Sequence, residues 1–154
     1  MRPAELCEQV LAEAAQVARA RGVALDAATG PAVAGAPEAP LDRAALARAA
    51  ANLVANAAEH ARSRVAVSCD VAGGSLVIEV ADDGQGFSPA ALERGCERLF
   101  TDDSSRSSRD GGLHYGLGLH AASEAARANG SAVSLANSPS GGAVATITIP
   151  LGGS

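Results

Sequence analysis

The fold is decided by the stretch LVIEVADDGQGF, residues 76–87. Its first half is apolar and β-branched, which predicts a strand over residues 76–80. The strand runs into Asp82 and then into Gly84 and Gly86, and glycine lets the backbone turn sharply and approach a flat ligand. A carboxylate at the end of an apolar strand is costly to bury without a donor, and an exocyclic amine such as adenine N6 is a suitable one. The alternative is a strand followed by an ordinary tight turn, because Asp and Gly are common turn residues.

Composition limits the class of protein. The chain has 154 residues, enough for one domain with a buried core. Hydrophobic residues make up 47% and aromatic residues 2%, so Ala, Val and Leu must build that core. A net charge of −5 without a basic block argues against a nucleic-acid partner. The sequence shows neither a signal-peptide pattern nor a long apolar run, so we expect a cytoplasmic domain, which a larger membrane protein could also carry.

The cysteines give no sign of a metal site. Cys7, Cys69 and Cys96 are odd in number and far apart, and no pair has the spacing of metal ligands. We therefore expect buried free thiols in a reducing compartment.

Hydrophobic periodicity and turn signals predict an α+β fold. Helices are expected over residues 3–21 (ended by Gly22), 42–62 (with Asp42 as N-cap), 88–98 and 116–128. Strands are expected near residues 23–26, over 64–72 and 75–81 as a hairpin, and over 131–137 and 143–150 as a second hairpin. Residues 27–40 are expected to be a loop with at most one short strand near Val33. This order favours a two-layer α/β sandwich, with a mixed sheet of about five strands covered on one face by three helices.

The helix predicted over residues 42–62 carries a polar row. Asn52, Asn56 and His60 are four residues apart and therefore lie along one face. Their apolar neighbours place the asparagines at the edge of a packed surface, where an amide oxygen can coordinate Mg²⁺. A solvent-exposed polar stripe is the alternative.

A third motif is Gly116-Leu117-Gly118-Leu119, which directly precedes a predicted helix. Glycines at a helix N-terminus let free N–H groups meet phosphate oxygens. The alternative is that the two glycines form only a flexible hinge. Residues 101–112, just before it, contain Asp, Ser, Arg and Gly but no apolar side chain, so we expect that segment to be mobile. The chain has no Walker-type loop.

In this order the motifs resemble the N box, first glycine box, F box and second glycine box of the GHKL ATPase superfamily. The matching segments are residues 52–60, 82–87, 99–100 and 116–119. The resemblance covers roughly residues 42–150 and is strongest to the catalytic and ATP-binding (HATPase) domain of bacterial sensor histidine kinases, which act in two-component systems. It implies a Bergerat-type sandwich that uses ATP and Mg²⁺.

The resemblance also implies a role for each matching residue. Asp82 would accept a hydrogen bond from adenine N6, and Asn56 would hold Mg²⁺. Residues 101–115 would form the ATP lid, in which Arg106 and Arg109 either contact phosphate or stay solvated. The remaining nucleotide-binding positions would be Asn52, His60, Gly84, Gly86, Phe87, Phe100, Gly116, Leu117, Gly118 and Leu119.

Three positions refine the expected activity. Glu59 stands where many family members carry Lys or Arg, so nucleotide affinity is expected to be weak or to depend on the lid arginines. Ala145 replaces an aromatic residue that is common in the last strand. Asn52 stands where the hydrolases of the superfamily carry a general-base Glu, and an amide cannot take a proton. This favours transfer of phosphate to a nucleophile supplied elsewhere.

The phosphoacceptor histidine is not found in this sequence. None of His60, His114 and His120 lies in a segment that resembles the family's acceptor motif. We therefore expect residues 1–154 to be a single kinase domain with no catalytic residue of its own identified. Residues 1–22 would lead from a phosphoacceptor dimerisation hairpin preceding Met1, and residues 151–154 would form a tail.

The expected partners follow from that organisation. They are the dimerisation hairpin of the parent kinase and a response regulator, with no nucleic acid and with a membrane reached only through the parent protein. The isolated domain is expected to be a monomer. Two alternatives stay open: a degenerate nucleotide-binding or partner-docking module, which Glu59 motivates, and a GHKL ATP hydrolase.

Overall fold

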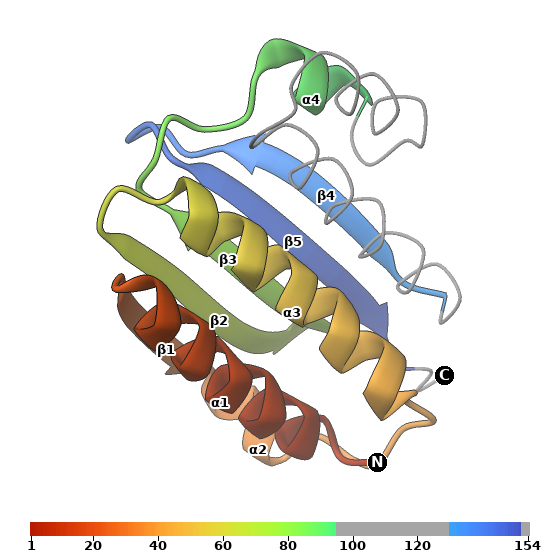
Figure 1. The fold of residues 1–154 in the computed structure, drawn as a ribbon. Helices are drawn as coiled ribbons and strands as arrows, with labels where there is room; N and C mark the ends of the chain where they lie inside the picture. Colours follow the sequence, from red (N-terminus) through yellow and green to blue (C-terminus); the bar gives the residue numbers. More distant parts are fainter. Residues whose placement is uncertain (95–129, 152–154) are drawn as a thin grey trace.

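The computed structural model describes residues 1–94 and 130–151 (Figure 1). Several expectations therefore lie outside the described residues. They are the helix over 116–128, the F box with Phe100, the lid with Arg106 and Arg109, the second glycine box (Gly116, Leu117, Gly118 and Leu119), and Cys96.

A five-stranded mixed sheet forms one layer of the described structure. Its strands lie in the order β1-β2-β3-β5-β4. Only β1 and β2 pair in parallel, and the other three pairings are antiparallel. Their bounds are β1 Ala24–Thr29, β2 Arg64–Ala72, β3 Ser75–Asp82, β4 Ala132–Asn137 and β5 Ala143–Pro150.

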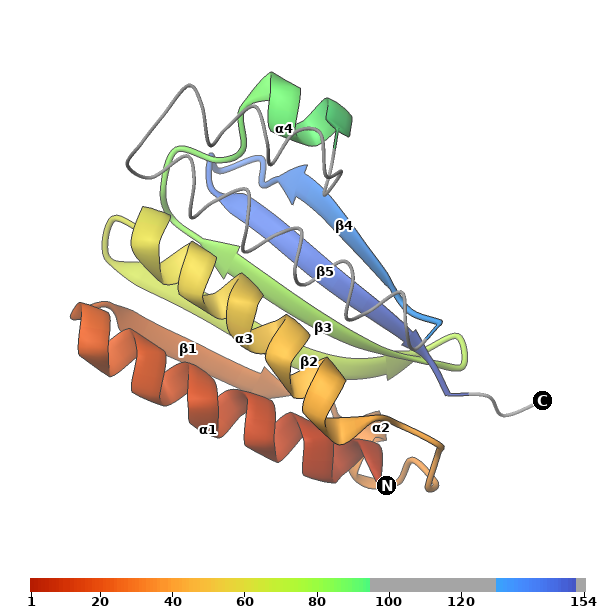
Figure 2. The same cartoon turned by 45° about the vertical axis from the view of Figure 1, so that its right-hand side comes forward.

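Two long helices form the second layer. Helices α1 (Pro3–Arg21) and α3 (Arg43–His60) lie side by side over the same face of the sheet (Figures 1 and 2). Alternate residues of the central strands point into this interface, as the buried Val67, Ile78 and Ile147 show, and leucines of the helices meet them. The expected two-layer α+β sandwich is therefore confirmed, with two of its three expected covering helices among the described residues.

Local signals account for most element boundaries. Gly22 ends α1 as predicted, and the Asp42 side chain caps α3 by accepting a hydrogen bond from the Ala45 N–H at 3.1 Å. The β2–β3 hairpin turns at Gly73 and Gly74, as the sequence indicated. The helix that begins after Ser88 is described as α4 (Pro89–Arg94).

One expectation for the fold is wrong. The loop expected over residues 27–40, with at most one short strand near Val33, is shorter than predicted, because β1 continues to Thr29 and a one-turn helix, α2 (Pro31–Ala34), follows. Pro31 suits the first position of a helix, and the turn brings Val33 into full burial against the core. The gain from burying Val33 therefore decides the conformation here.

No helix in the described part of the chain has both the length and the apolar character needed to cross a bilayer.

The turn between β4 and β5 packs directly on the end of β3. A Cβ atom on Gly142 would lie 1.7 Å from the carbonyl oxygen of Asp82, far inside van der Waals contact. The backbone of residue 142 therefore lies directly against the backbone of Asp82, and only glycine, which has no Cβ, leaves room for this contact.

Asp83 ties the end of β3 to the connection between α3 and β2. Its carboxylate accepts hydrogen bonds from the Ser63 hydroxyl at 2.7 Å and from the backbone N–H groups of Arg62, Ser63 and Arg64 at 2.8–3.2 Å. The bonds from the Ser63 hydroxyl and N–H, with those from Arg64 and Arg62, hold the pKa of the Asp83 carboxyl well below its usual range. Asp83 therefore fixes where the loop after β3 leaves the sheet.

We expect Gly142→Ala to lower the free energy of unfolding by about 1–3 kcal/mol, because the new methyl group collides with the Asp82 carbonyl. Gly35→Ala is the matched control, since a Cβ there meets nothing within 4 Å. Urea denaturation measures both variants, and equal stability of the two would contradict the close packing at Gly142.

Asp83 predicts a dependence of stability on acid. A carboxyl whose pKa is lowered by folding stabilises the protein above its unfolded pKa of about 3.9, and this contribution is lost as the pH falls toward the folded pKa. We expect the urea midpoint of the wild type to fall below about pH 4 more steeply than that of Asp83→Asn, with Ser63→Ala between them. Parallel pH profiles of all three proteins would count against this role.

Candidate nucleotide-binding site

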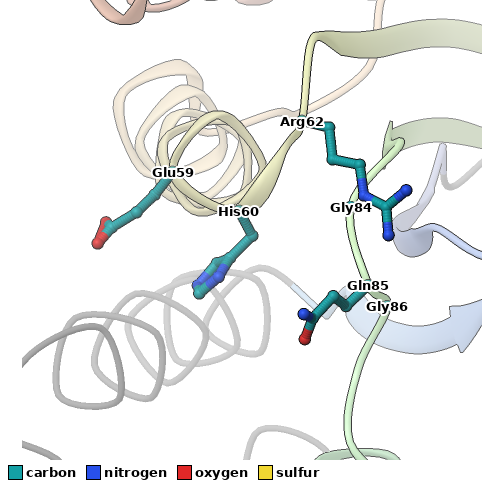
Figure 3. Close-up of a pocket in the computed structure, with 6 residues that line it drawn as sticks. All are labelled: Glu59, His60, Arg62, Gly84, Gln85 and Gly86. Carbon is teal, nitrogen blue, oxygen red and sulfur yellow. The ribbon is translucent and has the colours of Figure 1, made fainter.

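A cavity of about 380 Å³ opens where the C-terminal end of α3 faces the loop after β3 (Figure 3). The first wall belongs to the end of the predicted N box and the chain just after it. The second wall belongs to the predicted first glycine box. The lining residues are Glu59, His60, Arg62, Gly84, Gln85 and Gly86.

The two walls touch through their backbones. A Cβ atom on Gly84 would lie 2.1 Å from the carbonyl oxygen of His60. The loop after β3 can therefore lie against the end of α3 only because residue 84 has no side chain. Two motifs more than twenty residues apart in the sequence are thus joined here.

Asp82 stands at the end of β3, half-buried and held in one orientation. Its Oδ1 accepts a hydrogen bond from the Gly84 N–H at 2.8 Å and a longer one from the Ala143 N–H at 3.4 Å. Among the described residues, no donor reaches its second oxygen, Oδ2. The backbone thus fixes the carboxylate while leaving one oxygen for another donor.

Asn56 lies in α3 one turn before His60, and its side chain is buried. Its Oδ1 is inaccessible to solvent and has no hydrogen-bond partner in the part of the chain that the structure describes. An unmatched buried acceptor costs about 1–3 kcal/mol, which a bound cation or donor would recover. An amide oxygen is a hard ligand of the kind Mg²⁺ prefers, so this residue fits the predicted metal ligand.

The cavity does not gather every predicted residue. His60, Gly84 and Gly86 line it, whereas Asp82, Asn52 and Asn56 are not among the lining residues, and the two asparagines lie on earlier turns of α3. Within residues 1–94 and 130–151, no three side chains of His, Cys, Asp or Glu lie together so that they could hold a metal ion. A metal at Asn56 would therefore need phosphate or water oxygens to complete its coordination.

Phe87 has a different place from the one the sequence suggested. It is buried in the core and does not line the cavity. Its N–H donates to Asn137 Oδ1 at 2.7 Å, and its carbonyl accepts from Asn137 Nδ2 at 3.0 Å. Phe87 therefore anchors the loop after β3, and Asn137 at the end of β4 is a positioning residue that the sequence analysis missed.

The sequence analysis considered one of the two charged residues at the cavity, Glu59, but not the other, Arg62. The Glu59 carboxylate lies 3.8 Å from the Arg21 guanidinium of α1, and Figure 3 shows it directed away from His60. Arg62 lines the cavity from the far side, near Gly84. Arg62 follows His60 by two residues, just beyond the end of the predicted N box. This position was the sequence signal that could have identified Arg62.

The family comparison covers most of the chain. Residues 41–153 match the model of the family described as histidine kinase-, DNA gyrase B-, and HSP90-like ATPase. The signal transduction histidine-protein kinase AfsQ2 of Streptomyces coelicolor is 38% identical over 100 residues, which are 65% of this chain and 18% of AfsQ2. The chain thus spans less than a fifth of that relative.

Solved structures agree with the fold. The catalytic domain of histidine kinase ThkA superposes with a TM-score of 0.74 at 18% identity, covering 98% of this chain and 93% of that one. Full-length ShkA, solved in complex with AMPPNP, gives a TM-score of 0.69 at 25% identity over 95% of this chain and 29% of ShkA. With the motifs joined around one cavity and the family model matched over residues 41–153, the chain belongs to the family of histidine kinase-, DNA gyrase B- and HSP90-like ATPases.

Proposed function

We propose that this domain binds ATP with Mg²⁺ and transfers the γ-phosphoryl group to a histidine on a separate dimerisation domain of a two-component sensor kinase. The observation that carries the proposal is the contact of Gly84 with the His60 carbonyl, which puts the two motifs on opposite walls of one cavity. Support comes from AfsQ2, which is a histidine-protein kinase, and from ShkA, which binds AMPPNP, an analogue of ATP.

Asp82 would recognise the adenine base. Its Oδ1 is occupied by the Gly84 N–H, so the carboxylate cannot rotate freely, and its Oδ2 is the acceptor left for the N6 amine. A charged acceptor that is already oriented gives a stronger bond than a mobile neutral one. The glycines after Asp82 keep the approach to it free of side chains.

Asn56 would hold Mg²⁺, which neutralises charge on the phosphates when it is bound. Its unmatched amide oxygen is the observation of this structure that fits such a ligand. Arg62 adds a cation at the rim of the cavity. The Glu59 carboxylate lies toward Arg21, which reduces its repulsion of a phosphate, although an ion pair of 3.8 Å with an exposed arginine constrains it only weakly.

The residues around Asn56 favour transfer over hydrolysis. Asn52, one turn earlier on the same face of α3, carries an amide that cannot activate water as a base. Phosphoryl transfer depends mostly on positioning and charge neutralisation, so the domain can act on a nucleophile that it does not contain. The phosphate would then pass to a response regulator in the cytoplasm.

Asp82→Asn should weaken AMPPNP binding by at least about tenfold. The amide loses the charge that accepts from adenine N6, and a hydrogen bond to a charged group contributes about 1.5–3 kcal/mol. Isothermal titration calorimetry in Mg²⁺ measures the affinity. Asp70→Asn is the matched control: it removes the same charge at the opposite end of the β2–β3 hairpin, where Asp70 pairs with Val77, and should bind like the wild type.

Asn56→Ala should remove most of the effect of Mg²⁺ on AMPPNP affinity, because the variant lacks the amide oxygen that would hold the ion. AMPPNP is titrated into the wild type and into Asn56→Ala, once in Mg²⁺ and once in EDTA. The ratio of the two affinities gives the effect of Mg²⁺ for each protein. An unchanged ratio of the two affinities would exclude Asn56 as the ligand. If the wild type failed to bind at millimolar nucleotide, the domain would be the degenerate docking module.

The isolated chain should acquire no stable phosphohistidine when it is incubated with Mg-ATP, because none of its histidines resembles an acceptor. Intact-protein and peptide mass spectrometry under conditions that preserve phosphohistidine measure this. Phosphate on His60, His114 or His120 would show that the acceptor lies within this chain. Steady Mg²⁺-dependent release of phosphate would instead favour the hydrolase.

A further inference from the structure

Two thiols lie against each other in the core, away from the nucleotide site. Cys7 belongs to α1 and Cys69 to β2, and each is only 1% exposed. Both are free thiols, and their side chains are joined by a hydrogen bond. Because this contact links a helix to the sheet beneath it, a covalent bond between the two sulfurs would connect the two layers of the fold.

A second cavity is lined in part by one residue of the pair. It has a volume of about 190 Å³ and is lined by α1, the end of β1 and α2, which lie close together in Figure 2. Cys7 is among the lining residues, whereas Cys69 is not. The cavity is large enough for a molecule of a few heavy atoms, since one water occupies about 30 Å³. The lining residues are Ala4, Cys7, Glu8, Thr29, Val33 and Ala34.

The hydrogen bond makes the two thiols chemically unequal. The bond from Cys69 lowers the pKa of Cys7, against the raising effects of burial and of Glu8. The same bond, with burial and the charge of Cys7, raises the pKa of Cys69. Thiolates are far better nucleophiles than thiols, so Cys7, the residue of the pair that lines the cavity, is also the more nucleophilic one.

We propose that Cys7 and Cys69 form a site of reversible oxidation by hydrogen peroxide, in which Cys7 reacts first and Cys69 closes a disulfide between α1 and β2. In the first step the Cys7 thiolate attacks one peroxide oxygen and the O–O bond breaks, which gives a sulfenic acid and hydroxide. In the second step the hydroxide takes the proton of Cys69 and leaves as water, and the Cys69 thiolate attacks the Cys7 sulfur. The S–S bond forms, the S–O bond breaks, and hydroxide leaves. The thiol pair loses two electrons and the peroxide gains them.

The disulfide also has a structural consequence. An S–S bond of about 2.05 Å is shorter than any contact between two free thiols, so the two sulfurs must move toward each other when the bond forms. The link would constrain α1 against the sheet, while a thiol reductant would release it.

The test uses the full chain with Cys96→Ser, so that only the proposed pair can react. The folded protein is treated with hydrogen peroxide, alkylated, digested with trypsin without reductant and analysed by mass spectrometry. We expect the peptide containing Cys7 to be linked to the peptide containing Cys69, with a mass lower by two hydrogen atoms than their sum. Dithiothreitol should separate them. Glutathione, treated in parallel, shows that the peroxide is active.

Two variants test the order of events. With Cys69→Ala, Cys7 should stop at the sulfenic acid and be labelled by dimedone, whereas with Cys7→Ala, Cys69 should stay a thiol. The proposal is overturned if the folded Cys96→Ser protein forms no linked peptide while glutathione is oxidised, or if the link forms only in urea. Equal dimedone labelling of the two single variants would overturn the assigned order. The linked peptide is measured in the Cys96→Ser protein, which keeps both Cys7 and Cys69. This result therefore does not depend on whether the Cys7→Ala and Cys69→Ala variants fold.

Discussion

Contact between backbones, with no side chain in the gap, is the constraint on which the nucleotide site depends. Gly84 lies on the carbonyl of His60, and Gly142 lies on the carbonyl of Asp82. These contacts join the end of α3, the end of β3 and the turn before β5, which are far apart in the sequence. The sheet and the helix layer would form without such contacts, because their core is made of buried aliphatic side chains. The cavity would not, since any larger residue at position 84 would separate its walls.

Two adjacent carboxylates at the end of β3 show how the same residue type takes two roles. Successive side chains of a strand point to opposite sides, so Asp82 and Asp83 face different surroundings. Asp83 receives four hydrogen bonds from residues 62–64 and holds the chain in place. Asp82 receives its bonds on one oxygen only. Asp83 thus holds the fold together, whereas Asp82 keeps one oxygen with no donor among the described residues, and the proposed recognition of adenine would use that oxygen.

The sequence predicted those parts of the fold that have local signals. The cap at Asp42, the stop at Gly22 and the Gly73-Gly74 turn are each specified by neighbouring residues, and the structure agrees with all three. Helix α2 was missed because four residues carry no periodicity, and Pro31 alone is a weak local signal for a turn whose Val33 is buried against distant residues. Asn137 was missed for a similar reason, since it holds Phe87 across fifty positions of the sequence. The spacing of the motifs thus predicted the two segments that line the cavity, but not residues such as Asn137 that hold those segments in place.

Glu59 shows why a departure from a family pattern has to be judged in three dimensions. From the sequence it places a negative charge at the phosphates, but in the fold its carboxylate lies beside Arg21, while Arg62 lines the same cavity. The described lining therefore carries one full charge of each sign, and a chain of net charge −5 supplies no general attraction for a polyphosphate. If the proposed function holds, binding in such a site would come from directed groups: an oriented carboxylate for the base, and backbone, amide and metal for the phosphates. Affinity would then respond strongly to single substitutions in those groups and only weakly to changes in overall charge.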